Sequence, residues 1–267
     1  MEIFIDETLK IFKETKISSD FIKDRFKKDA DIVILNGYPI YENKFLKDGD
    51  KVTLIKKGEI PTFEELENLM VARHTPNVHA NLKKGKVAIL GLGGLGSNIA
   101  ISLARIGVGH MILVDFDIVE PSNLNRQQYF ISDIGKYKTD ALKNHIKNIN
   151  PFIKVDTVNK IIDSSNINEF VDVDIIMEAF DNPRYKAEIA NFVLKNMKEI
   201  HLISSSGMAG YYDSNMIKTR MVKDRFYICG DETNEAKEGD GLMAPRVSIC
   251  ANHMANLATK ILVECTE

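Results

Sequence analysis

Short apolar and alternating stretches fill the first 57 residues and predict a small α+β unit. Strand-length stretches occur at residues 1–5, 8–12, 32–35 and 52–55. A helix is expected after Ser18-Ser19-Asp20, because these residues offer N-cap side chains and apolar residues follow at helical spacing. Asn36-Gly37 and Asp48-Gly49 are turn signals between the later strands. The predicted order of elements is therefore β-β-α-β-β.

Residues 58–84 are expected to connect this unit to the rest of the chain. Thr62 and Glu65 have the spacing of a capping box, which predicts that a short helix begins there. The apolar residues that follow recur on one helical face. The helix is expected to end at Arg73-His74-Thr75-Pro76.

From residue 85 onward, apolar strands alternate with helical stretches. The strands are predicted at residues 87–90, 111–114, 153–158, 175–179 and 202–205, and the helices at 95–106, 137–149 and 184–197. Two further strand-like stretches and a helix, predicted at about 246–263, complete the chain. Strands that alternate with helices predict a Rossmann-like, mostly parallel sheet flanked by helices over residues 85–267.

Composition narrows the classes of function. The 267 residues are 44% hydrophobic and 27% charged, with a net charge of −3, so a general affinity for nucleic acid is not expected. The sequence contains neither a long apolar run nor a signal-like N-terminus, which predicts a cytoplasmic protein without a membrane partner. Three cysteines without a C-x-x-C pair exclude a four-cysteine zinc site, so no zinc is expected.

A glycine-rich segment between a predicted strand and helix indicates a phosphate-binding turn. Gly91, Gly93, Gly94, Gly96 and Ser97 lie in the run GLGGLGS. Glycines permit a tight turn close to a phosphate, and the helix N-terminus supplies free N–H groups. Asp115 ends the next strand, 19 residues beyond Gly96, where an acid can bind ribose hydroxyls. These features alone predict an adenine nucleotide, with NAD as the default.

A polar block beyond the second strand favours a nucleoside triphosphate instead. It contains Asp117, Asn123, Arg126 and Gln127, and it is followed by Lys138 at the start of a helix and by Asp181 at the end of the fourth strand. The carboxyl ends of parallel strands meet at one sheet edge, where ligands bind. Arg126 and Lys138 are suited to neutralising a triphosphate, and Asp181 to holding Mg²⁺ through its phosphates. A hydride-transfer site does not need this cluster.

Together these motifs resemble the ThiF/MoeB/HesA family of adenylyltransferases, which are related to ubiquitin-activating enzymes. The similarity is carried by GLGGLGS at 91–97, DFDIVEPSNLNRQ at 115–127, GKYK at 135–138 and AFDN at 179–182. LARIGVG at 103–109 and LMAPRVSICANHMAN at 242–256 place the chain nearest the thiamine-type enzymes.

The resemblance implies that ATP and Mg²⁺ are used to adenylylate a small ubiquitin-like sulfur carrier that ends in Gly-Gly. It implies that Asp115 binds the ribose, that Asp181 is the metal-binding acid, and that the enzyme is a homodimer. Arg73 is a weaker match to the arginine that reaches the nucleotide of the other subunit. The residues expected around the phosphates are Asn123, Arg126, Gln127 and Lys138.

The N-terminal unit resembles a β-grasp sulfur carrier of thiamine biosynthesis, through ILNGYPI and LKDGDKVTLIKKG. Working carriers end in Gly-Gly, whereas here Gly58 is followed by Glu59 and the chain continues. The unit is therefore expected to be a carrier relic or mimic rather than a substrate. Cys229 is the nearest candidate for a covalent link to a carrier, although a buried structural role is favoured.

Two other functions compete with the adenylyltransferase hypothesis. One is an NAD-dependent oxidoreductase, which would leave Arg126, Lys138 and Asp181 unexplained. The other is a nucleotide-binding scaffold whose carrier-like unit permanently occupies its own docking groove.

Overall fold

The computed structural model describes residues 1–264 and divides the chain into two compact units, Met1–Ala80 and Asn81–Glu267. Cys265 lies outside the described residues. The division into residues 1–57, 58–84 and 85–267 stays a prediction about domains. Among the described residues, no helix is long and apolar enough to cross a membrane.

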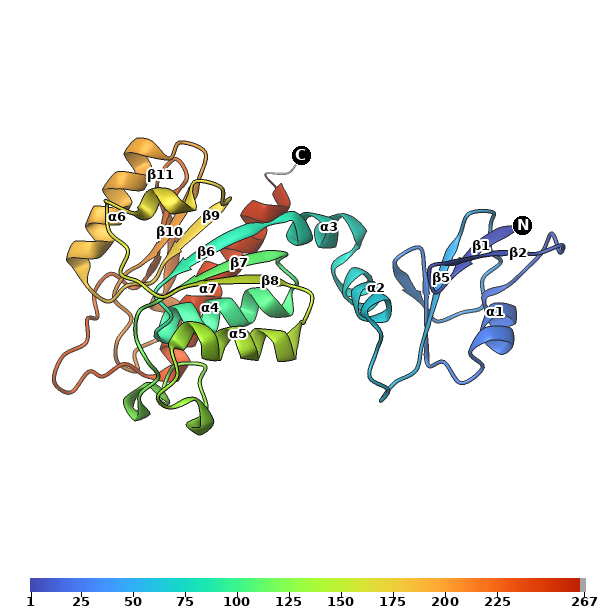
Figure 1. Ribbon diagram of the computed structural model, residues 1–267, viewed down its shortest axis with the longest axis horizontal. Coiled ribbons are helices and arrows are strands. Elements are labelled where there is room, and N and C mark those ends of the chain that lie inside the picture. The colour runs from blue at the N-terminus through green and yellow to red at the C-terminus, as the bar shows by residue number, and fades with distance from the viewer. Residues whose placement is uncertain (265–267) are drawn as a thin grey trace. The chain divides into compact units, whose positions relative to one another are not determined.

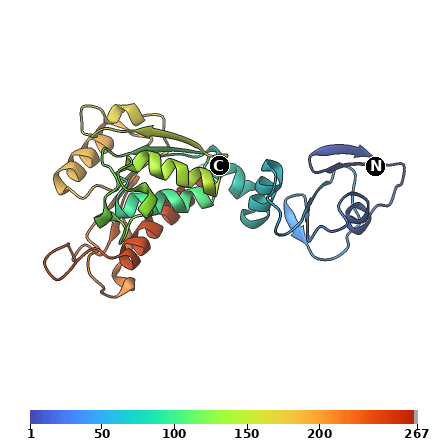
Figure 2. The same ribbon diagram turned by 60° about the horizontal axis from the view of Figure 1, so that its bottom comes forward.

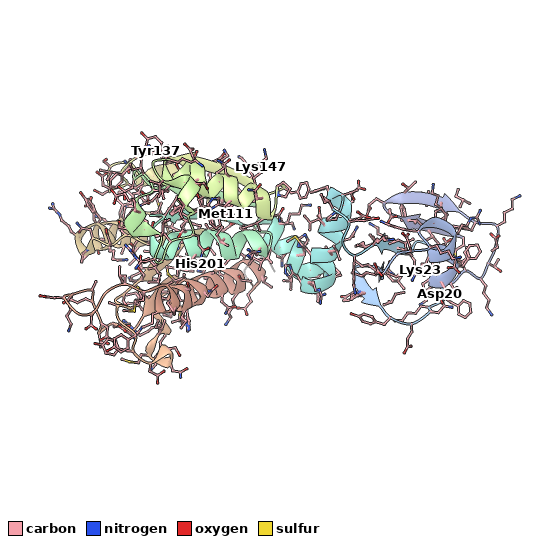
Figure 3. All side chains as sticks on the ribbon, turned by 90° about the horizontal axis from the view of Figure 1, so that it is seen from below. Asp20, Lys23, Met111, Tyr137, Lys147 and His201 are labelled. Atoms are coloured by element: carbon pink, nitrogen blue, oxygen red, sulfur yellow. The ribbon has the colours of Figure 1, made fainter. Side chains whose placement is uncertain are left out.

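The first unit is a five-stranded mixed sheet with helices (Figure 1). Its elements are β1 (Glu2–Ile5), β2 (Thr8–Ile11), α1 (Ser19–Phe26), β3 (Ile32–Leu35), β4 (Tyr38–Ile40), β5 (Lys51–Ile55) and α2 (Phe63–His74). The strand order is β2-β1-β5-β3-β4. Ile22 of α1 packs into a core with Ile3, Val52 and Leu54, while α2 contacts β3, β4 and β5. Asp20 and Lys23 mark α1 in Figure 3.

Local signals place most boundaries of this unit correctly. Ser18 caps α1 by accepting the N–H of Phe21, and Thr62 and Glu65 form the predicted capping box of α2. Strand β4 was not predicted, because three residues that include a proline carry little strand signal. It pairs with β3 across the predicted Asn36-Gly37 turn.

One helix of the connection was also absent from the prediction. Thr75 has a φ of 71°, which ends α2, and Pro76 then begins α3 (Pro76–Lys84). Proline is well suited to the first position of a helix, where its missing N–H costs nothing. The sequence His74-Thr75-Pro76 therefore marks a boundary between two helices rather than the end of helical structure.

The second unit is built on a seven-stranded sheet in the order β11-β12-β10-β9-β6-β7-β8. The strands are β6 (Lys86–Leu90), β7 (His110–Val114), β8 (Lys154–Val158), β9 (Ile175–Glu178), β10 (His201–Ser205), β11 (Lys218–Lys223) and β12 (Phe226–Gly230). Neighbouring strands run parallel except for β11, which is antiparallel to β12. This confirms the predicted Rossmann-like, mostly parallel sheet.

Helices cover both faces of this sheet. They are α4 (Gly94–Arg105), α5 (Lys138–Ile149), α6 (Pro183–Asn196) and α7 (Ala244–Glu264). Helices α5, α4 and α7 lie side by side on one face (Figure 2), and Tyr137 and Lys147 mark the two ends of α5 (Figure 3). On the other face, α6 packs Ile189 and Val193 against Leu90 and Leu202.

The central strand β6 sets the position of the site. Val87–Leu90 are fully buried, because the strand lies between β7 and β9 and has helices on both faces. The chain leaves β6 toward β7 and β8 on one side and later returns to β9 on the other. In open α/β sheets, such a reversal of strand order leaves a crevice at the carboxyl ends of the strands.

Candidate functional site

A cleft of about 940 Å³ lies at the carboxyl ends of β6, β7, β9 and β10, a size typical of small-molecule sites. Ten predicted site residues line it: Gly91, Gly93, Gly94, Asp115, Asp117, Asn123, Arg126, Gln127, Lys138 and Asp181. The topology therefore brings together residues that are up to 90 positions apart in the sequence.

The glycine loop leaves backbone groups accessible to a ligand. Gly91 has a φ of +88°, and a Cβ there would lie 3.0 Å from the carbonyl oxygen of Ala179. A Cβ on Gly96 would lie 1.8 Å from the carbonyl oxygen of Gly91, so only glycine permits this approach of α4 to β6. Gly93 is the N-cap of α4 and has no side chain to accept a hydrogen bond, which leaves N–H groups of the first turn for an anion.

Asp115 holds the loop in place from the end of β7. Its Oδ2 accepts the N–H of Leu92 at 2.6 Å, and its Oδ1 accepts the N–H of Asp117 at 2.8 Å. The Tyr129 hydroxyl donates to the carbonyl oxygen of Leu92 at 2.8 Å, and burial raises the pKa of this hydroxyl. Each Asp115 oxygen keeps a further lone pair for a ribose hydroxyl.

A short 3₁₀ turn at Pro121–Asn123 presents the amide side chains. Asn123 is buried, and its Oδ1 accepts the N–H of Glu120 at 3.0 Å. Gln127 is 8% exposed, and its Oε1 has no hydrogen-bond partner among residues 1–264. A buried acceptor without a partner is costly, so Gln127 is suited to a ligand that brings a donor.

The two predicted cations differ in their surroundings. Lys138 is buried and its Nζ lies 2.8 Å from Oδ2 of Asp117, which also lines the cleft. Arg126 is partly exposed, and its Nη1 donates to the carbonyl oxygen of Ser122 and to Oδ1 of Asn125. Contacts with neighbouring residues therefore fix both positively charged side chains at the cleft.

Asp181 contributes a carboxylate to the cleft. It is exposed at the end of the strand-to-helix connection, and within the described chain it makes neither a hydrogen bond nor an ion pair. No group of three or more His, Cys, Asp or Glu side chains among residues 1–264 is placed to hold a metal by itself. The Asp181 carboxylate fits Mg²⁺, which is commonly held by one or two carboxylates together with substrate phosphates.

Some predicted residues lie outside the cleft. Gly96 and Ser97 are behind the loop, where the Ser97 hydroxyl donates to the carbonyl oxygen of Gly93 and accepts the N–H of Gln128. Arg73 belongs to α2 in the first unit. Cys229 is fully buried on β12, and burial raises the pKa of its thiol, which suits a structural residue rather than a nucleophile.

The structure adds a polar cluster that the sequence analysis did not identify. Glu178, at the end of β9, pairs with Lys186 of α6, and Lys186 also donates to the Ser205 hydroxyl at the end of β10. Lys186 and Ser205 line the cleft. An acid closing an otherwise apolar strand, IIME, is the signal that would have pointed to it.

Family models match both parts of the chain. Residues 66–267 match the ThiF family, and residues 1–58 match a model described as ThiS-like ubiquitin. The second match agrees with the β-grasp resemblance of the N-terminal unit.

Curated relatives match parts of the chain. The tRNA threonylcarbamoyladenosine dehydratase of Haemophilus influenzae is 32% identical over 148 residues, which are 54% of this chain and 56% of the relative. The adenylyltransferase and sulfurtransferase UBA4 of Scheffersomyces stipitis is 29% identical over 205 residues, covering 76% of this chain and 43% of the relative. The chain spans about half the length of the curated relatives it matches first.

Solved structures share the fold. The Escherichia coli tRNA N6-threonylcarbamoyladenosine dehydratase TcdA, in complex with ATP, superimposes with a TM-score of 0.67 at 20% identity, over 74% of this chain and 93% of that chain. Escherichia coli MccB with ATP gives a TM-score of 0.58 at 22% identity, over 78% and 65% of the chains. With the family match covering residues 66–267, the chain belongs to the ThiF family.

Proposed function

We propose that the protein uses ATP to adenylylate the C-terminal glycine carboxylate of a small ubiquitin-like sulfur carrier that ends in Gly-Gly, and that it does so in thiamine biosynthesis. The observation that carries the proposal is a cleft that combines an uncapped helix N-terminus with Arg126, Lys138 and the unpaired carboxylate of Asp181. ATP as the nucleotide is supported by the complexes of TcdA with ATP and with AMP.

In the proposed reaction, a carboxylate oxygen of the carrier forms a bond to the α-phosphorus of ATP, and the bond to the β-phosphate bridging oxygen breaks. Pyrophosphate leaves with the electron pair, and no proton needs to move. The attacking group is already an anion, so the protein needs no Ser, Cys or Lys nucleophile. Its task is to hold two anions together and stabilise the charge.

Each part of the cleft has a role in this reaction. The N–H groups at the start of α4 bind phosphate oxygens, and Asp115 accepts hydrogen bonds from the ribose. Arg126 and Lys138 offset the triphosphate charge, and the side-chain N–H groups of Asn123 and Gln127 donate to the phosphates and orient them. Asp181 would hold Mg²⁺, which offsets further phosphate charge when bound.

The proposal includes three features of the whole protein. It acts in the cytoplasm as a homodimer, with Arg73 reaching the nucleotide of the other subunit. Its N-terminal unit is a docking or regulatory element and not a substrate, because Gly58 lies in a peptide bond and has no free carboxylate. An NAD-dependent oxidoreductase gains no support from the ThiF family match.

A second candidate follows from the names of the relatives. Several are tRNA threonylcarbamoyladenosine dehydratases, so a tRNA substrate competes with the carrier protein. The net charge of −3 weighs against general RNA affinity. The ThiS-like unit and the match to an adenylyltransferase and sulfurtransferase favour the carrier.

The test is exchange of labelled pyrophosphate into ATP, with substrates added one at a time. Gly-Gly-ending carriers form one arm, and tRNA bearing threonylcarbamoyladenosine forms the other. Exchange that requires a carrier and its terminal glycine supports the proposal. Exchange or dehydration that requires only the tRNA replaces it with the second candidate, and ATP binding without either reaction favours the scaffold.

A further inference from the structure

An ion pair with a buried carboxylate joins three elements at the wall of the cleft. Glu178 is completely buried at the end of β9, and its two carboxylate oxygens lie 2.9 and 3.0 Å from Nζ of Lys186. Lys186 also donates to the Ser205 hydroxyl at 2.7 Å. These three acceptors match the three donors of an ammonium group, so Lys186 is already satisfied by the protein.

The same carboxylate controls the backbone that leads to Asp181. Oε1 of Glu178 accepts the N–H of Phe180, the residue before Asp181, at 2.7 Å. On the other side, the N–H of Ala179 donates to the carbonyl oxygen of Leu90 at 2.9 Å. Asp181 follows directly, and its own side chain has no protein partner within residues 1–264. Its direction is therefore set by the backbone of residues 179–180.

We propose that the Glu178–Lys186 pair positions Asp181 for the metal–nucleotide complex: Lys186 holds the Glu178 carboxylate in place, and Glu178 fixes the turn that aims Asp181 into the cleft. Lys186 is thus a positioning residue and not a phosphate ligand. This inference rests on the proposed function, because it assigns a task to residues around Asp181.

Burial explains why the pair must act as a unit. Burial raises the pKa of Glu178, and Lys186 opposes that shift. Removing Lys186 alone leaves a buried acid without its counter-charge, whereas replacing both members by neutral side chains is often tolerated. A glutamine at 178 still offers an oxygen to the N–H of Phe180, and an alanine does not.

The experiment measures ATP binding by calorimetry, with Mg²⁺ and with EDTA, in the absence of any carrier. The variants are Lys186→Met, Lys186→Arg, and the pairs Glu178→Gln/Lys186→Met and Glu178→Ala/Lys186→Met. Lys260→Met is the control, because it removes a lysine from an exposed ion pair on α7. Thermal melting reports the folded state of each variant.

We expect Mg²⁺ to tighten ATP binding by the wild-type protein. Glu178→Ala/Lys186→Met should lose about tenfold or more of that gain, the usual cost of removing a residue that orients a metal ligand, with little change in EDTA. Lys186→Met should lower the melting temperature, because it leaves the buried acid without its counter-charge. Glu178→Gln/Lys186→Met, Lys186→Arg and Lys260→Met should keep most of the gain in ATP binding.

Two results would overturn the inference, and they are distinguishable. If the wild type binds ATP with Mg²⁺ and the folded Glu178→Ala/Lys186→Met protein keeps the full gain, the positioning role is wrong and the proposed function stands. If the wild type binds no ATP, the proposed function falls and this inference falls with it. If Lys186→Met fails to fold, the comparison of Glu178→Gln/Lys186→Met with Glu178→Ala/Lys186→Met still tests the inference.

Discussion

Asp115 holds the glycine loop through Leu92, whose N–H donates to Oδ2 of Asp115 at 2.6 Å. Asp115 is only 9% exposed, and its other oxygen accepts the N–H of Asp117. One carboxylate therefore fixes both the loop after β6 and the polar block after β7. The residue expected to bind ribose also shapes the site that the ribose would enter.

Asp115→Asn should weaken ATP binding and destabilise the second unit. An asparagine offers one acceptor where the carboxylate offers two, so one buried N–H loses its partner at a cost of about 1–3 kcal/mol. Calorimetry and thermal melting check the two effects. The control is Asp163→Asn, which changes a surface Asp that accepts the N–H of Ser165. Equal effects of the two substitutions would contradict the anchoring role of Asp115.

Lys138→Met should reduce pyrophosphate exchange by about 10²–10³-fold, as expected when a preorganised charge partner of the transition state is removed. The protein should remain folded, because Asp117 is half exposed and can be solvated when its partner is lost. Lys154→Met is a suitable control, since Lys154 forms an exposed ion pair on β8. Exchange by the folded Lys138→Met protein at the wild-type rate would remove Lys138 from the mechanism.

Gly96→Ala should destabilise the fold of the second unit by about 3 kcal/mol or more, because the added Cβ overlaps a backbone atom that cannot move away cheaply. The overlap is with the carbonyl oxygen of Gly91, 1.8 Å from the ideal Cβ position. Gly241→Ala provides the comparison, as its Cβ would meet no atom within 4 Å. Urea unfolding of both variants measures the difference. Equal stabilities would mean that α4 can shift without cost.

Cys229 and Cys250 should be nearly unreactive in the native protein at pH 8. Burial raises the pKa of the Cys229 thiol and raises that of Cys250 to about 12, and only the thiolate reacts, so burial disfavours the reactive form of both. Alkylation followed by mass spectrometry checks this, with urea-unfolded protein as the control in which both should react. Rapid native labelling of Cys229, or loss of exchange in a folded Cys229→Ala protein, would reopen its role as a nucleophile.

Periodicity and turn chemistry predict most of this fold, because its elements are locally consistent. Strand β6 is apolar from Val87 to Leu90, and the helix after it begins at a glycine run, so both elements are clear from the sequence. Strand β4 and helix α3 were not foreseen, for opposite reasons. Strand β4 is too short to show an alternating pattern. Helix α3 begins at Pro76, and a proline in the sequence is as consistent with the end of a helix as with the beginning of one.

The candidate site is predictable where motif residues line the cleft directly. Arg126, Lys138 and Asp181 stand out in the sequence because they are charged residues that lie after an apolar strand or at the start of a helix. Glu178 and Lys186 do not stand out, because their importance depends on burial and on contact between β9, α6 and β10. Nor does sequence reveal that Asp117 is the partner of Lys138, a pairing made by the folded chain.

The most direct test of adenylyl transfer to a carboxylate is the intact mass of the carrier after incubation with the protein, ATP and Mg²⁺. We expect an AMP adduct on a Gly-Gly-ending carrier, released pyrophosphate in equal amount, and no adduct on a carrier that lacks its final glycine. We also expect no adduct with a folded Asp181→Ala protein. An adduct on the shortened carrier, an adenylate on residues 1–58, or no adduct on any carrier would contradict the proposed function.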